Sequence, residues 1–305
     1  MPSWPVLVSI ITGASLTLAV ATPAMNVAKT DRDEARTVVP ELLHWAQRRG
    51  MQPLCDKETA AICPDAGVAT ARKPDLPGQV DLLVVLGGDG TLLAMARLVG
   101  DLGVPILGVN LGGLGFLTAL TVDELFPALE AYLGGGLVVE ERMMLAAAVS
   151  REGEQLVDYV ALNDMVITKS AMSRIIRLEV SVDGELATAY RADGLIISTP
   201  TGSTAYCLSA GGPIVFPTMD AVVLTPICSH TLTNRPIVLP ADQRIDVRLL
   251  TDQDVMLTAD GQVGFALRQW DTIEVRRASP RIRLLRFPQK HFFSVLRTKL
   301  KWGER

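Results

Sequence analysis

The chain has 305 residues, of which 49% are hydrophobic and 20% are charged, with a formal net charge of −4. This is enough apolar material for one large domain or two ordinary ones, and it excludes a disordered chain. No basic block gives an electrostatic footprint for nucleic acid, and four cysteines without a Cys-x-x-Cys pair favour reduced thiols over a disulfide scaffold or a zinc site.

The N-terminus is apolar, because no charged residue precedes Lys29 and residues 6–24 are apolar or small. A signal peptide would carry a basic n-region, which this segment lacks. A membrane span needs about 20 strongly apolar residues, and Ser, Thr, Gly and Pro dilute this run. We therefore expect residues 1–24 to be an extra segment outside the catalytic core, ahead of a cytoplasmic protein that does not enter a membrane.

Residues 25–120 carry the pattern of an α/β domain. Residues 25–29 could form a first strand, and apolar spacing predicts a helix from Asp31 onward, with Pro40 expected to kink or break it. A continuous apolar run at 81–86 is typical of a parallel strand buried on both faces. A helical stretch and a second apolar run at 104–110 follow, so that strand, loop, helix and strand make a βαβ unit.

The pattern changes further along the chain. A helix is expected over 122–133, and short alternating stretches that end at Asp-Gly or Pro continue to about residue 287. Regular short strands separated by turn signals predict a β-rich second domain over 121–285. We expect residues 286–305 to return to the first domain.

The pentapeptide GGDGT at 87–91 stands where the strand at 81–86 should end. Ligands bind at that edge of α/β sheets, and the following helix N-terminus offers free N–H groups to phosphate. A carboxylate at Asp89 repels phosphate, so it makes sense as a base for a hydroxyl or as a ligand of a phosphate-bound cation. A tight turn with a helix-capping aspartate accounts for the pentapeptide equally well.

A second dense segment is TPTGSTAY at 199–206, which follows the apolar stretch that begins after Asp193. Its hydroxyls can hydrogen-bond a ligand and its tyrosine can stack on a ring, although a capped helix start explains them too. Asn163 and Asp164 are polar residues within an apolar run, for which structural pairing is the simpler explanation. Asp260-Gly261 by itself is an ordinary hairpin turn.

Together these segments resemble the NAD kinase family. The similarity runs from about residue 80 to 265, and its blocks occur in the family order: GGDGT at 87–91, NLGGLGFL at 110–117, ERMML at 141–145, LNDMVI at 162–167, DGLIISTPTGSTAYCLSAGGPIV at 193–215, HTLTNRPIV at 230–238 and DGQ at 260–262. The resemblance implies a Rossmann-like α/β N-terminal domain and a β-sandwich-like C-terminal domain. It also implies a cytoplasmic homo-oligomer, a dimer or tetramer, that needs a divalent cation.

The resemblance assigns roles by motif. Asp89 corresponds to the catalytic proton acceptor, Asn163 and Asp164 to the pair that holds a ribose and its neighbours, and 204–209 to the loop around adenine and nicotinamide. The family pair is commonly Asn-Glu, and Ser229 stands where proline is common. The residues implied for NAD are Asp89, Gly90, Asn163, Asp164, Arg174, Arg191, Asp193, Thr204, Ala205, Tyr206, Cys207, Leu208, Ser209 and Gln262, and those of the phosphate loop are Gly87, Gly88 and Thr91.

The implied reaction is transfer of the γ-phosphate of ATP to the adenosine ribose 2′-hydroxyl of NAD, which yields NADP and ADP. Positioning and charge stabilisation dominate such chemistry, and Mg²⁺ with ATP is the expected cofactor, without an identifiable protein-ligated metal site. A lipid kinase of the diacylglycerol type shares a GGDGT-like loop, but TPTGSTAY and HTLTNRPIV argue against it. A non-catalytic NAD sensor is disfavoured because Asp89 is intact.

Overall fold

The structure is a computed structural model that describes residues 17–21, 29–170, 172–231 and 233–303. It has two compact units, unit 1 comprising Met1–Glu140 with Arg283–Arg305, and unit 2 comprising Glu141–Ile282. Each unit has its own hydrophobic core. Strands β6 (Val138–Arg151) and β17 (Thr272–Arg286) run along the chain from one unit into the other.

Unit 1 is a parallel sheet with the strand order β17-β5-β4-β1-β2-β3. Its remaining strands are β1 (Thr17–Ala21), β2 (Gln52–Asp56), β3 (Ala69–Ala71), β4 (Leu82–Leu86) and β5 (Ile106–Val109). Its α-helices are α1 (Lys29–Arg48), α2 (Lys57–Ala60), α3 (Asp89–Val99), α4 (Leu125–Leu133) and α6 (Phe292–Leu300), and its 3₁₀ helices are η1 (Pro64–Ala66), η2 (Lys73–Asp75), η3 (Pro77–Gln79), η4 (Gly100–Leu102) and η5 (Val122–Glu124).

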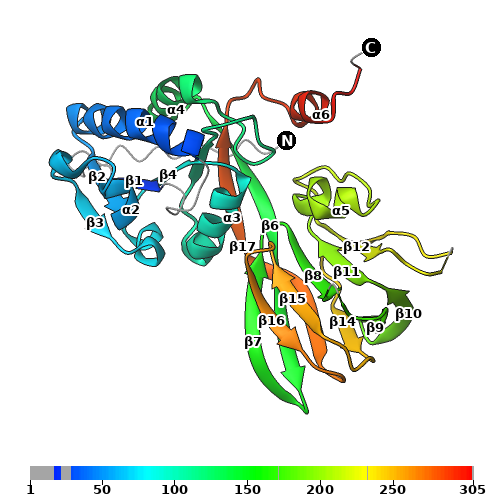
Figure 1. Ribbon diagram of the computed structural model, residues 1–305. Coiled ribbons are helices and arrows are strands. Elements are labelled where there is room, and N and C mark those ends of the chain that lie inside the picture. Colours follow the sequence, from blue (N-terminus) through cyan, green and yellow to red (C-terminus); the bar gives the residue numbers. More distant parts are fainter. Residues whose placement is uncertain (1–16, 22–28, 171, 232, 304–305) are drawn as a thin grey trace. The chain divides into compact units, whose positions relative to one another are not determined.

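Helices α1 and α4 lie together on one face of this sheet (Figure 1). Trp45 of α1 donates from its indole N–H to Glu130 of α4 at 3.1 Å. Leu82, Val84 and Leu86 of β4 join the same core cluster, and alternation along the strand directs the residues between them to the opposite face. The layers are those of a Rossmann-like α/β domain.

The first described strand corrects one expectation from the sequence. Strand β1 lies between β2 and β4, with Leu18 paired to Leu82 on one side and to Pro53 on the other. The prediction that residues 1–24 lie outside the core is therefore wrong for residues 17–21. The physical reason is that a short uncharged apolar run is what a parallel strand covered on both faces requires. Residues 25–28 of the predicted first strand lie outside the described residues, and Lys29 begins α1.

Two further expectations differ from the structure. Helix α1 passes through Pro40 and continues to Arg48, because tertiary packing of its apolar face outweighs one lost backbone hydrogen bond. The division between the units lies after Glu140 and not at residue 120, since α4 buries Leu125 and Leu129 in the core of unit 1. The C-terminal residues from Arg283 belong to unit 1.

Unit 2 is a β-sandwich. One layer has the order β10-β9-β14-β17, with β6 pairing β17 and β7, and the other has the order β13-β12-β11-β8-β15-β16. Its strands besides β6 and β17 are β7 (Glu154–Ala161), β8 (Asp164–Lys169), β9 (Ile176–Val182), β10 (Glu185–Ala192), β11 (Gly194–Ser198), β12 (Ala221–Ile227), β13 (Ile237–Pro240), β14 (Ile245–Leu249), β15 (Val255–Ala259) and β16 (Val263–Leu267), and its helices are η6 (Gly202–Thr204) and α5 (Tyr206–Ser209).

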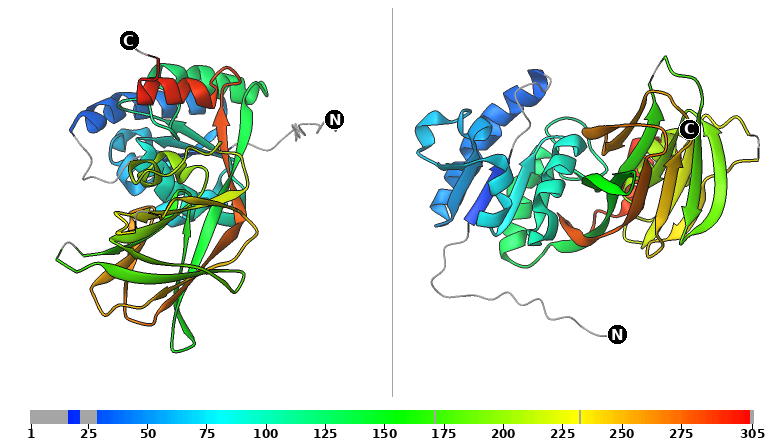
Figure 2. Two further views of the ribbon diagram at one scale, coloured as in Figure 1. Left: turned by 90° about the vertical axis from the view of Figure 1, so that its right-hand side faces the viewer. Right: turned by 90° about the horizontal axis from the view of Figure 1, so that it is seen from below.

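The core of unit 2 lies between these two layers, which face each other in Figure 2. Leu178, Val180 and Val247 of one layer and Ile167 and Ile197 of the other are fully buried in one cluster. The predicted fold class, an α/β domain followed by a β-sandwich-like domain, is confirmed. Over the ranges that the structure describes, no helix is long and apolar enough to cross a membrane.

Candidate active site

The GGDGT segment joins the carboxyl end of β4 to the start of α3. Gly87 and Gly88 form the link, and Asp89, Gly90 and Thr91 are the first residues of the helix. The first turn of an α-helix carries backbone N–H groups without intrahelical partners, together with the positive end of the helix dipole. The segment lies at the edge of the sheet where ligands bind, and the N–H of Thr91 donates to the carbonyl of Gly88 at 3.0 Å.

The carboxylate of Asp89 is fixed by the glycine-rich segment that follows β5. Its Oδ1 accepts hydrogen bonds from the N–H of Leu117 at 3.1 Å, the N–H of Thr118 at 2.9 Å and the hydroxyl of Thr118 at 2.9 Å. Its Oδ2 accepts one, from the N–H of Phe116 at 2.9 Å. Four donors hold this carboxylate in one orientation.

A glycine makes this arrangement possible. A Cβ atom on Gly115 would lie 2.2 Å from Asp89 Oδ1 and 2.4 Å from the hydroxyl oxygen of Thr118. Asn110, at the end of β5, donates from its side-chain amide to the same hydroxyl at 2.7 Å. The GGDGT and NLGGLGFL motifs of the sequence therefore form one site, which residues 110–118 build around Asp89.

In unit 2, the Asn163-Asp164 pair is held by Asp260. The Asp260 carboxylate accepts from the backbone N–H of Leu162 at 3.2 Å, of Asn163 at 2.8 Å and of Asp164 at 3.3 Å. In return, the N–H of Asp260 donates to the carbonyl of Asp164 at 2.9 Å. The sequence indicated only a hairpin turn at Asp260, so this role was missed; a carboxylate rather than an amide ahead of Gly261 was the one available signal.

The TPTGSTAY segment packs on the same pair. The hydroxyl of Thr199 donates to the carbonyl of Leu162 at 2.6 Å, and its N–H donates to the carbonyl of Asn163 at 2.8 Å. A Cβ atom on Gly202 would lie 2.2 Å from the carbonyl oxygen of Asn163. The backbone of the segment thus lies directly against Asn163, and only glycine fits at position 202.

Asn163 has one feature that points to a ligand. Its Oδ1 atom is buried and has no hydrogen-bond partner among the described residues. Buried polar atoms are nearly always paired, and an orphaned acceptor costs free energy of about 1–3 kcal/mol. A ligand that donates a hydrogen bond here would remove that cost.

Asp164 is itself a buried carboxyl group, 5% exposed. Burial, followed by the charge of the neighbouring Asp260, raises the pKa of Asp164 from 3.8 to about 7. Asp164 is therefore partly protonated at neutral pH. A protonated carboxyl group can donate a hydrogen bond as well as accept one.

The other predicted binding residues of unit 2 have varied surroundings. Tyr206 is 46% exposed and available for stacking, whereas Cys207 is fully buried with its Sγ 3.2 Å from the hydroxyl of Thr225. Only the backbone of Cys207 could contact a ligand. Thr204 belongs to η6, Ala205 links η6 to α5, and Leu208 and Ser209 complete α5.

The charged candidates and the terminal glutamine lie on strands and turns. Asp193 lies between β10 and β11 and forms an ion pair with Lys169 at 3.7 Å. Arg191 is an exposed residue of β10. Arg174 precedes β9, where its N–H donates to the side chain of Gln253 at 3.2 Å. Gln262 is exposed in the turn between β15 and β16, two positions after Asp260.

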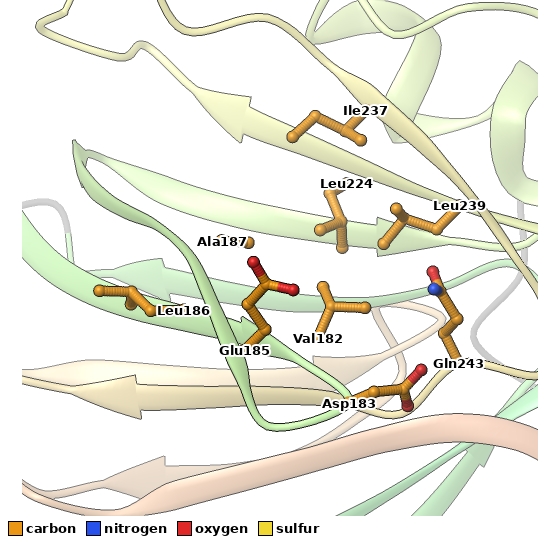
Figure 3. A pocket seen from close by; sticks show the side chains of 9 residues that line it. All are labelled: Val182, Asp183, Glu185, Leu186, Ala187, Leu224, Ile237, Leu239 and Gln243. Atoms are coloured by element: carbon orange, nitrogen blue, oxygen red, sulfur yellow. The ribbon is translucent and has the colours of Figure 1, made fainter.

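In the part of the chain that the structure describes, no group of three His, Cys, Asp or Glu side chains could hold a metal ion. An open cavity of about 470 Å³ in unit 2 is lined by neither Asn163 nor Asp164. It lies between the β9–β10 hairpin and strands β12 and β13 (Figure 3), and its lining residues are Val182, Asp183, Glu185, Leu186, Ala187, Leu224, Ile237, Leu239 and Gln243.

Known proteins resemble this chain over most of its length. Residues 25–137 match the ATP-NAD kinase N-terminal domain, and residues 162–287 match the ATP-NAD kinase C-terminal domain. An NAD kinase of Geobacter metallireducens is 54% identical over 91% of this chain and 98% of that protein. An NAD kinase of Geobacter sulfurreducens is 52% identical over the same shares of both chains.

Two solved structures have a similar fold. The yeast NADH kinase complexed with NADH superposes with a TM-score of 0.87 at 25% identity, covering 96% of this chain and 90% of that one. The Archaeoglobus fulgidus NAD kinase in complex with ATP gives a TM-score of 0.71 at 22% identity, covering 94% and 99%. At its lower identity, the second comparison supports the fold alone.

Proposed function

This chain belongs to the ATP-NAD kinase family, and we infer that it transfers the γ-phosphate of ATP to the 2′-hydroxyl of the adenosine ribose of NAD. The products are NADP and ADP. The observation that carries the assignment to a residue is the Asp89 carboxylate, oriented by four hydrogen bonds at the start of α3.

Asp89 is the residue we propose as proton acceptor, and the two oxygens of its carboxylate differ. Oδ1 accepts three hydrogen bonds and Oδ2 accepts one. A carboxylate has about four lone-pair sites, two on each oxygen, so Oδ2 retains the capacity to accept a further proton. In the reaction, the ribose 2′-oxygen forms its bond to the γ-phosphorus while the bond from that phosphorus to the β,γ-bridging oxygen breaks. The 2′-hydroxyl proton passes to Oδ2.

The dinucleotide contacts that we propose follow from the surroundings of Asn163. Its unpaired Oδ1 would accept a hydrogen bond from a ribose hydroxyl or an amide of NAD. Asp164, Arg174, Arg191, Asp193, the 204–209 segment and Gln262 complete the set carried over from the family motifs. The start of α3, with Gly87 and Gly88 before it, would face the phosphates of ATP, whose charge the positive end of the helix dipole favours.

Mg²⁺ would enter with ATP. Mg²⁺ is commonly held by one or two carboxylates together with substrate phosphates and water, so it would need no dedicated cage of protein ligands. When bound, it neutralises the charge of the phosphates.

We further propose a cytoplasmic homo-oligomer, a dimer or tetramer, that binds neither nucleic acid nor membrane. Strand β13 is the edge of its sheet, and it exposes Ile237 and Val238 by 38% and 48%. An exposed apolar edge strand tends to pair with another chain unless something covers it, and a second subunit can cover it. Light scattering at micromolar concentration is expected to give at least a dimer, and a fully active monomer would contradict this part of the proposal.

The central experiment is an assay of NADP formation from NAD, ATP and Mg²⁺ with the wild type and Asp89→Asn. A positioned base contributes roughly 10²- to 10⁴-fold, so we expect kcat to fall by that factor while KM for NAD changes little. An Asp89→Asn enzyme within threefold of the wild-type kcat would show that Asp89 only caps its helix and holds the loop. Phosphorylation of diacylglycerol instead of NAD would favour a lipid kinase, and NAD binding without ADP release would favour a sensor.

A further inference from the structure

We propose that the C-terminal segment of residues 286–302 positions the catalytic carboxylate, with Lys290 as the positioning residue that ties down the loop donating hydrogen bonds to Asp89. This inference rests on the role proposed above for Asp89. It concerns contacts within unit 1 only, which contains Asp89, the loop and the C-terminal segment.

The first observation is where the Lys290 ammonium binds. Its Nζ donates to the carbonyl of Ala119 at 2.6 Å and to Oε2 of Glu124 at 2.5 Å. Ala119 directly follows Thr118, whose N–H and hydroxyl both donate to Asp89. The Lys290 ammonium therefore holds the backbone at Ala119, the residue that directly follows the donors to Asp89.

The second observation is that the anchor on the other side of Lys290 is itself rigid. Oε2 of Glu124 accepts from the N–H of Thr121 at 2.9 Å and from its hydroxyl at 3.1 Å, which closes a capping box at the start of η5. Partial burial alone would raise the pKa of Glu124, but the bonds from Lys290 and Thr121 outweigh it and hold this pKa below its usual value. Glu124 is thus ionised at neutral pH.

The third observation is that Lys290 is held in place by its own segment. Its N–H donates to the carbonyl of Phe287 at 3.1 Å, and its carbonyl accepts from Nη1 of Arg286 at 3.2 Å. Arg286 is fixed in turn by Glu140, at 2.6 Å from its Nε. With 24% of its side chain exposed, Lys290 is a partly buried cation with defined partners.

The same segment reaches the other end of the donor loop. Nζ of Lys299, on α6, lies 5.9 Å from the centroid of the Phe116 ring, which is within the range of a cation–π contact. The N–H of Phe116 is the one donor to Asp89 Oδ2. Lys299 therefore contacts the first of the three donor residues, Phe116, and Lys290 binds the carbonyl of Ala119, which follows the last.

The consequence concerns orientation. Removing the Lys290 contacts frees the 116–124 segment to shift, and with it the three residues that orient Asp89. A displacement of about 1 Å at a reacting group can lower a rate by roughly 100-fold.

The test compares Lys290→Met with Lys290→Arg and with the matched control Lys301→Met, an exposed lysine of the same segment. In the NADP assay we expect kcat of Lys290→Met to fall about 10- to 100-fold, with KM for NAD within threefold. Lys290→Arg, which keeps the charge and the donors, should recover most of the rate, and Lys301→Met should resemble the wild type.

A double variant separates positioning from an independent effect. If Lys290 acts through Asp89, adding Lys290→Met to Asp89→Asn should lower kcat by no more than about threefold further. A full additional loss, or a Lys290→Met enzyme with the wild-type kcat, would overturn the inference. Should Lys290→Met fail to fold, Glu124→Gln weakens the same tie and is expected to lower kcat while KM for NAD stays within threefold; an unchanged kcat would also overturn the inference.

The outcomes for the two proposals are distinguishable. A wild-type enzyme that forms no NADP, or an Asp89→Asn enzyme with full activity, would refute the proposed function. An active wild type and an impaired Asp89→Asn beside a normal Lys290→Met would refute only the positioning role of Lys290.

Discussion

The carboxylate of Asp260 accepts a hydrogen bond of 2.8 Å from the backbone N–H of Asn163, a residue 97 positions earlier in the chain. The hairpin turn between β15 and β16 thereby supports the backbone of Asn163, whose side-chain Oδ1 is a buried acceptor without a hydrogen-bond partner. Asp260 has a φ of 51°, in the left-handed region that aspartate and asparagine tolerate. Its conformation and its carboxylate can therefore be tested separately.

Asp260→Asn is expected to keep the hairpin turn and to weaken the hydrogen bonds that hold residues 162–164. An amide has one acceptor oxygen where the carboxylate has two, so at least one of the three hydrogen bonds to residues 162–164 is lost, at a cost of about 1–3 kcal/mol. If this segment binds NAD, KM for NAD should rise by roughly tenfold, since 1.4 kcal/mol corresponds to that factor. Initial rates over a range of NAD concentrations measure it.

Asp183→Asn is the matched control for Asp260→Asn. Asp183 also has a φ of 51° in a hairpin turn, and its Oδ1 accepts one backbone N–H, from Arg244 at 2.9 Å. This turn lies between β9 and β10, away from residues 162–164 in the sheet pairing. Equal changes of KM in both variants would remove Asp260 from the binding site.

The second prediction concerns pH and Asp164. A carboxyl whose pKa rises on folding binds its proton more tightly in the native state, so its contribution to stability is largest below the unfolded pKa of 3.8 and is lost as the pH rises to about 7. Each pKa unit corresponds to about 1.4 kcal/mol, which limits the loss to about 4 kcal/mol. Urea unfolding measures the free energy of unfolding at pH 5 and at pH 8. Between these two pH values it should fall less for Asp164→Asn than for the wild type. An identical decline in both proteins would mean that Asp164 does not titrate in this range.

The third prediction concerns the close contact at Gly202. In Gly202→Ala, the new methyl group would lie 2.2 Å from the carbonyl oxygen and 2.5 Å from the carbonyl carbon of Asn163. Because backbone and not a flexible side chain is in the way, we expect a loss of about 3 kcal/mol or more in the free energy of unfolding. Gly78→Ala, where the added atom meets nothing within 4 Å, should stay within about 0.5 kcal/mol of the wild type. A Gly202→Ala protein as stable as Gly78→Ala would show that the two segments do not pack as described.

Sequence patterns predicted a parallel α/β domain and a β-rich second domain for physical reasons, and the family resemblance added the sandwich and the roles of the motifs. Buried parallel strands such as β4 are unbroken apolar runs, and the glycines around Asp89 and Asn163 are required by close backbone approach. The hydrogen bonds that join distant segments were beyond the same reasoning. That Asp89 is held by residues 116–118, or that Asp260 holds residues 162–164, depends on the register of whole strands, which no local pattern contains.

The errors have a common cause. Helix α1 continues through Pro40, α4 packs in unit 1, and β1 belongs to the sheet. In each case tertiary packing outweighed a local signal in the sequence. The signal was a proline for α1, a change of composition for α4 and the lack of a family motif for β1. The match to the model of the N-terminal domain does not include this strand, because it begins at residue 25.

The fourth prediction tests that strand directly. A protein beginning at Met25 lacks β1, which pairs with β2 on one side and with β4 on the other. Its loss leaves the facing edges of both strands without partners and removes Leu18, which is fully buried. We expect this variant to be insoluble, or soluble without a cooperative thermal transition. A variant that begins with a methionine followed by residue 17 keeps the strand and should unfold as cooperatively as the full chain. Circular dichroism and a thermal melt compare the three proteins. If the protein beginning at Met25 is soluble, cooperative and fully active, the centre of the sheet is filled by another segment and the strand order given for unit 1 is wrong.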